Sequence, residues 1–200
     1  MTFLSCNNST DKDKRQLNLS NLSSNLDLKP ADNKNVEEKL KENKLKQSDC
    51  VRGTPEPVIR KNIFPKTNFT LQADSLTGIE NVEFDNGDKL TIENGGCEYF
   101  TLNFRFESSR FIADTTNTKF WADKALKLIQ VTERGIDAPV DLKKGIKAFG
   151  NYITKTQNPK LNEETDYGIN EIRYFVYLNR IQKLTNSKFA IELTFSVGPL

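Results

Sequence analysis

The aromatic residues of this chain are unevenly distributed, and this constrains most strongly what the chain can fold into. Eighteen of its 19 Phe, Tyr and Trp residues follow Thr54, and Phe3 is the exception. Residues 1–54 carry 10 basic and 8 acidic side chains but little apolar surface. Burial there would not compensate for the entropy lost on ordering. We therefore predict a disordered polar tail or tether over residues 1–54 and a single domain over residues 55–200.

Alternation of apolar and polar residues predicts β-strands in the second region. It is strict over residues 188–197, and over residues 97–106 it directs Phe100, Leu102, Phe104 and Phe106 toward one face. Further strands are expected over residues 58–63, 69–73 and 171–181.

A β-hairpin is predicted over residues 82–93. Asn86 and Gly87 supply the two residues with positive φ that a type I′ turn requires. Asp85 and Asp88 flank them and are expected to solvate the turn.

Two helices are predicted from apolar residues recurring every three or four positions. The first covers residues 117–134, with Trp121 on its apolar face and Thr116 or Asn117 as its cap. The second runs from the N-cap Asp141 to residue 154. Strands, two helices and two more strands indicate an α+β fold, an antiparallel β-sheet with both helices packed on one face.

The strand over residues 97–106 presents a mixed face opposite its phenylalanines. Tyr99, Thr101, Asn103 and Arg105 point there, and we take these four as the candidate binding surface. The alternative is an ordinary solvated face, which antiparallel sheets commonly have.

The chain contains no histidine, which excludes Ser-His-Asp and Cys-His catalysis and histidine-ligated metals. No cofactor and no metal site are predicted. Residues 55–200 carry 19 basic and 19 acidic side chains; nucleic-acid binding is therefore not expected, because it requires clustered positive charge. No apolar run approaches the roughly 20 residues of a membrane span.

The first residues include Phe3-Leu4-Ser5-Cys6, which resembles the end of a bacterial lipobox. The resemblance covers four residues, and the basic n-region and most of the apolar h-region of a signal peptide are missing. One explanation is an incomplete signal peptide whose true start lies upstream. The resemblance implies a lipoprotein of the cell envelope, anchored through lipid on Cys6, facing the periplasm and held on a polar tether. The alternative is a cytoplasmic protein with a frayed amino terminus.

Two further cysteines, Cys50 and Cys97, remain. In an oxidising compartment they would form a disulfide that fixes the end of the tail to the sheet. The alternative is two free thiols, with Cys97 buried as a small apolar residue.

These observations favour a non-enzymatic binding module outside the cytoplasm, whose partner is another protein. A specific version is a lipid-anchored inhibitor of immunity type that neutralises a secreted toxin. One alternative is a cytosolic interaction protein with a disordered arm. Another is a small carboxylate-dependent hydrolase, with these candidate residues: Glu163, Glu164, Asp166, Tyr167 and Glu171.

Overall fold

The computed structural model describes residues 50–168 and 171–199. Residues 1–49, including Cys6 and most of the predicted tail, lie outside the described residues. The boundary after Thr54 and the lipid anchor therefore stay predictions. Among the described residues, no helix is long and apolar enough to cross a membrane.

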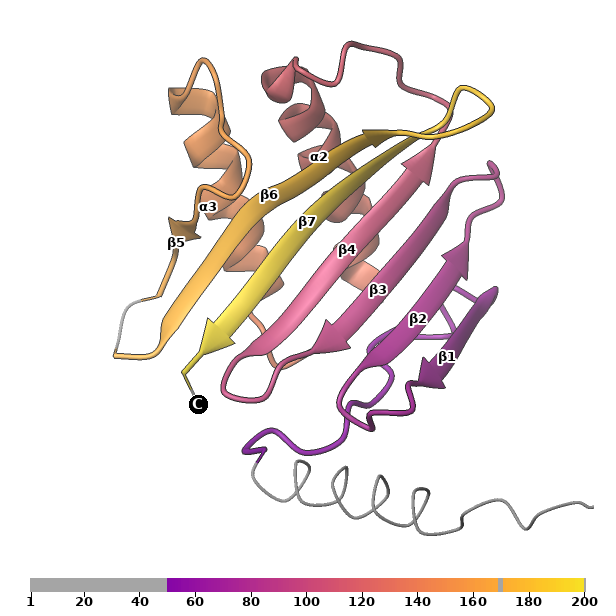
Figure 1. Cartoon of the computed structure of the whole chain (residues 1–200), viewed down its shortest axis with the longest axis vertical. Coiled ribbons are helices and arrows are strands. Elements are labelled where there is room, and N and C mark those ends of the chain that lie inside the picture. The colour runs from indigo at the N-terminus through magenta and orange to yellow at the C-terminus, as the bar shows by residue number, and fades with distance from the viewer. Residues whose placement is uncertain (1–49, 169–170, 200) are drawn as a thin grey trace, which may run out of the picture.

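The described chain forms one seven-stranded sheet in which every neighbouring pair is antiparallel. The strands are β1 (Thr67–Leu71), β2 (Gly78–Glu83), β3 (Lys89–Gly95), β4 (Phe100–Ser108), β5 (Thr165–Asp166), β6 (Arg173–Lys183) and β7 (Phe189–Gly198). Their spatial order is β1-β2-β3-β4-β7-β6-β5. The helices α2 (Thr118–Thr132) and α3 (Leu142–Lys155), with the 3-10 turn η1 (Glu133–Gly135), come between β4 and β5. Both helices lie behind the sheet in Figure 1, which confirms the predicted α+β class.

The core lies between the helices and the inner face of β4 and β7. Phe104 and Phe195 are fully buried and meet edge to face at 5.7 Å. Trp121 of α2 packs on Phe189 at a ring distance of 4.7 Å. Gly145 allows α3 to approach closely, because a Cβ there would lie 2.7 Å from the ring of Phe195. The predicted phenylalanine stripe is therefore confirmed as core.

The hairpin joins β2 to β3 as predicted, but its turn differs. The amide of Gly87 donates to the carbonyl of Phe84, and Gly87 has a φ of 82°. Asn86 does not have a positive φ, so the type I′ prediction is wrong. Asp88 is also only 5% exposed. It pairs with Arg110, which follows β4, so its predicted role in solvating the turn is wrong.

Both helices begin at residues named from the sequence. The Asn117 side chain accepts the Phe120 amide, and the Asp141 side chain accepts the Lys144 amide. These bonds satisfy donors that the first helical turn leaves free.

The edge strand predicted over residues 58–63 is wrong. Only an isolated bridge forms there, between Ile59 and Ile136. The amides of Val58 and Ile59 instead donate to one carboxylate oxygen of Glu80, at 2.9 and 3.1 Å. The Glu80 side chain therefore holds this segment against the sheet, in place of the main-chain hydrogen bonds that a neighbouring strand would supply.

Candidate functional site

A groove lies on the helix-bearing face of the sheet, at the end where α3 begins. Two adjoining hollows form it, with volumes of about 570 and 260 Å³. Both are lined by Pro139, Ile172 and Tyr174. The apolar lining of the larger hollow consists of Val51, Pro57, Val58, Phe100, Pro139, Ile172, Tyr174 and Val197. We call the two hollows together the end groove.

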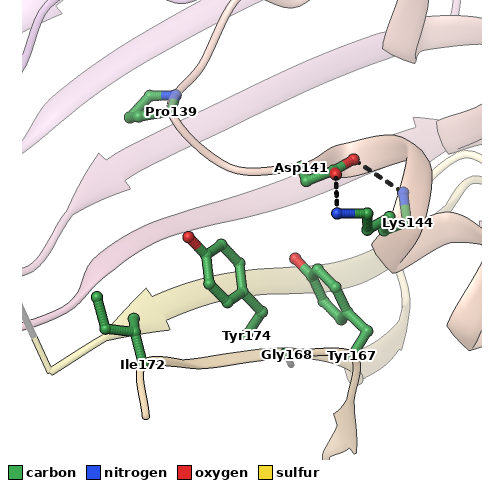
Figure 2. Close-up of a pocket in the computed structure, with 7 residues that line it drawn as sticks. All are labelled: Pro139, Asp141, Lys144, Tyr167, Gly168, Ile172 and Tyr174. Atoms are coloured by element: carbon green, nitrogen blue, oxygen red, sulfur yellow. Dashed lines mark hydrogen bonds and ion pairs between the residues drawn. The ribbon is translucent and has the colours of Figure 1, made fainter. Parts of the chain in front are cut away.

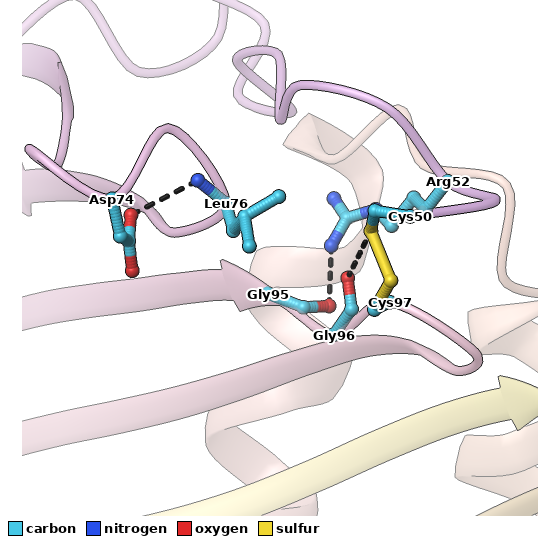
Figure 3. Close-up of a disulfide and its surroundings, with 7 residues drawn as sticks. All are labelled: Cys50, Arg52, Asp74, Leu76, Gly95, Gly96 and Cys97. Carbon is cyan, nitrogen blue, oxygen red and sulfur yellow. Dashed lines mark hydrogen bonds between the residues drawn. A yellow bond between two sulfur atoms is a disulfide. The ribbon is translucent and has the colours of Figure 1, made fainter. Parts of the chain in front are cut away.

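The outer wall of the end groove is the segment that follows Cys50. A disulfide joins Cys50 to Cys97, as predicted, with a Cα–Cα distance of 5.0 Å (Figure 3). This bond fixes Val51 and Arg52 beside the connection between β3 and β4. The segment that the sequence assigned to the end of the tail is thus part of the site.

Arg52 lies at this wall, above the Phe100 ring at 4.1 Å from the ring centre. Its two terminal nitrogens donate to the Gly95 carbonyl and to the Asn94 side-chain oxygen. Burial lowers the pKa of the Arg52 guanidinium from its ordinary value. No carboxylate of the described chain comes within ion-pair distance of it. Among the described residues, the groove therefore contains a partly desolvated positive charge whose hydrogen-bond acceptors are neutral.

Two buried polar side chains hold the wall in place. Asn94 is 2% exposed, and its side-chain nitrogen donates to the Glu56 carbonyl at 2.9 Å. Glu80 is also 2% exposed and binds the Val58 and Ile59 amides through one oxygen. Its other oxygen has no hydrogen-bond partner in the described structure. Burial raises the pKa of this carboxyl group, and the two amides partly oppose that effect.

The smaller hollow combines a helix start with two phenols. The Lys144 ammonium pairs with the Asp141 carboxylate at 3.1 Å. The hydroxyls of Tyr167 and Tyr174 both point toward the segment of Pro139 and Asp141 (Figure 2). The Tyr167 hydroxyl is buried without a hydrogen-bond partner among the described residues. Burial, with a smaller effect from Asp141, raises the pKa of Tyr167.

The predicted binding surface lies on the opposite face of the sheet. Thr101, Asn103 and Arg105 follow one another along β4, on the face that the helices leave open. Tyr99 precedes β4 and packs its ring against Phe175 of β6 at 6.2 Å. The structure thus places three of the four residues in one row and the fourth at its end. Whether they bind a partner stays a prediction.

The polar groups of this outer face are paired across the strands. The hydroxyls of Thr101 and Ser196 lie 2.6 Å apart, and Thr194 donates to Asn103 at 3.3 Å. Arg105 donates to Glu192 at 2.6 Å and to Glu107 at 3.0 Å. Cross-strand pairs of this kind stabilise a sheet without any ligand.

The carboxylates proposed for a hydrolase do not meet in a cleft. Glu164 and Asp166 are exposed and share Arg173, at 2.8 and 3.2 Å. Glu163 accepts the Tyr152 hydroxyl at 2.9 Å. Tyr167, in contrast, lines the end groove beside Asp141.

Comparisons with known proteins give no relative from which to transfer a function. No protein-family model, curated protein or solved structure matches the chain. Within the described residues, no group of three or more His, Cys, Asp or Glu side chains could hold a metal ion.

Sequence reasoning missed the end groove. Segments far apart in the sequence form it, and neither Tyr174 nor Pro139 belongs to a recognisable motif. The sequence contained one indication that Arg52 belongs to a site, because a disulfide at Cys50 would place the next two residues against the sheet.

Proposed function

We propose that this chain is an extracytoplasmic protein-binding module that takes a segment of its partner into the end groove. The observation that carries the proposal is a groove that combines apolar lining residues with exposed aliphatic side chains at its rim. Val51 is 68% exposed and Ile172 is 41% exposed, and both line the larger hollow. Exposed apolar surface around a concave site is typical of a binding site.

The cell-envelope location belongs to the same proposal. A disulfide is expected where the compartment is oxidising, and the Cys50–Cys97 bond supports a place outside the cytoplasm. The lipid anchor on Cys6 and the immunity-type role would follow from such a location. Mass spectrometry of the protein from its host tests the anchor, because a diacylglyceryl group on Cys6 supports it and an intact Met1 contradicts it.

The binding surface is tested by peptide selection on the full, oxidised chain. Peptides enriched from a random display library are measured against three variants that each introduce one lysine. Ile172→Lys blocks the groove, Asn103→Lys alters the outer face, and Val131→Lys changes an exposed aliphatic residue of α2 (59% exposed). Circular dichroism confirms that each variant is folded.

The groove proposal expects Ile172→Lys to weaken peptide binding by about tenfold or more. Asn103→Lys and Val131→Lys should bind as the parent does. If only Asn103→Lys loses binding, the binding site is the predicted outer surface and not the groove. Equal binding by all three variants, or no enriched peptide, would contradict the proposal.

A further inference from the structure

Arg52 is a charged lining residue of the larger hollow, and apolar contacts alone do not explain its position. A guanidinium has five N–H donors and no acceptor. Two hydrogen bonds of Arg52 go to Gly95 and Asn94. Within the described residues three donors are left without a partner, and Phe100 covers the guanidinium on one face.

The hydrogen bonds to Gly95 and Asn94 also orient the guanidinium. A planar donor held in place on an aromatic ring loses less freedom when it binds a carboxylate. Arginine and carboxylate pair through two parallel hydrogen bonds, and such charge-assisted bonds are stronger than neutral ones. The half-buried site strengthens this attraction because less water screens it.

The other charges of the groove have different surroundings. Asp137 pairs with Arg60 at 3.5 Å, and Lys144 pairs with Asp141 at 3.1 Å. Glu56 is exposed and lines the larger hollow. A ligand carboxylate near Glu56 or Asp137 would be repelled. The groove therefore attracts a carboxylate at the Arg52 guanidinium itself and not at the other charged residues of its lining.

We propose that the partner segment is extended, aliphatic along the groove and acidic at one position, and that Arg52 binds that carboxylate. This inference rests on the proposed function, since it names the chemistry of the segment that enters the groove.

The test compares acidic peptides with their amide counterparts. Peptides selected as above are synthesised with every Asp or Glu kept, or changed to Asn or Gln, and with blocked termini. The ratio of the two dissociation constants is measured for the parent chain, Arg52→Gln, Arg52→Lys and Arg134→Gln. Arg134→Gln removes the same charge from an exposed residue that lines neither hollow. A second set with free carboxyl termini separates a side-chain carboxylate from a terminal one.

We expect the parent and Arg134→Gln to prefer the acidic peptide by about ten- to a hundredfold. Arg52→Gln should lower this ratio to near one, and Arg52→Lys should keep part of it. A purely structural role for Arg52 would weaken both peptides equally and leave the ratio unchanged, which would overturn the inference. A ratio near one in the parent would overturn it as well.

Failure of the underlying function has a different signature. If Ile172→Lys leaves peptide binding intact, the groove is not the binding site, and the inference fails with the function. If binding depends on the groove but shows no preference for the acidic peptide, only the role of Arg52 is overturned and the proposed function stands.

Discussion

The open face of the sheet and the end groove differ in how their polar groups are satisfied. On the open face, Glu192 is almost buried and binds Arg105, with Arg180 at 3.7 Å on its other side. In the part of the end groove that the structure describes, Arg52 donates to neutral acceptors, and the Tyr167 hydroxyl has no hydrogen-bond partner. Buried polar groups in folded proteins are normally paired. The polar side chains named on the open face therefore pair with one another, whereas our proposal assigns the groups in the groove to a partner.

The largest loss of stability is expected on the core face of β7, where a substitution should cost much more than one on the open face of the same strand. Phe195→Ala removes a fully buried ring and should lower the free energy of unfolding by about 3–5 kcal/mol. Ser196→Ala changes the next residue on the open face and should cost about 1 kcal/mol, the value of one hydrogen bond. Urea denaturation measures both. Similar losses would contradict the division into a core face and a solvated face.

Replacing both bridged cysteines should destabilise the domain somewhat less. The disulfide closes a loop with a sequence separation of 47. By chain entropy, Cys50→Ser with Cys97→Ser should cost about 2–4 kcal/mol. The double variant should also lose peptide binding under conditions where it is folded, because the wall carrying Arg52 is released. Unchanged binding would show that the wall forms without the disulfide.

Charge pairing on the open face can be tested at Glu192. Glu192→Gln leaves Arg105 with Glu107 and should lower stability by about 1–2 kcal/mol. Glu83→Gln is the matched change in the exposed pair with Lys89 and should have little effect. A stability loss in Glu192→Gln no larger than in its control would mean that the open face is not stabilised by its own charges.

The smallest change in stability is expected for a substitution in the end groove. Tyr167→Phe removes a hydroxyl that has no partner among the described residues, so stability should change by less than about 0.5 kcal/mol or rise slightly. Thermal denaturation gives this value. A loss above about 1 kcal/mol would mean that the hydroxyl is already bonded in the folded protein.

The sequence was most informative where a structural element depends on its own residues. The apolar alternation of β4 and β7 identified the inner face, because side chains of a strand point alternately to the two sides of a sheet. Asn117 and Asp141 were recognised as caps because a cap binds an amide only three residues away.

It was least informative where distant residues meet. Asp88 was expected in solvent but is buried by its pair with Arg110, 22 residues later. Glu80 belongs to no motif in the sequence, yet it binds two amides more than 20 residues away. The end groove depends on such contacts throughout.

The disulfide also has a mechanical consequence. If the protein is tethered to a surface through its amino-terminal segment, any pull on that segment reaches the domain at Cys50. The covalent bond to Cys97 passes the load directly to the connection between β3 and β4, in the middle of the sheet. The bond bypasses the chain between the two cysteines, which includes Arg52, β1 and β2. A protein-binding domain tethered in this way would keep the wall of its end groove intact under tension.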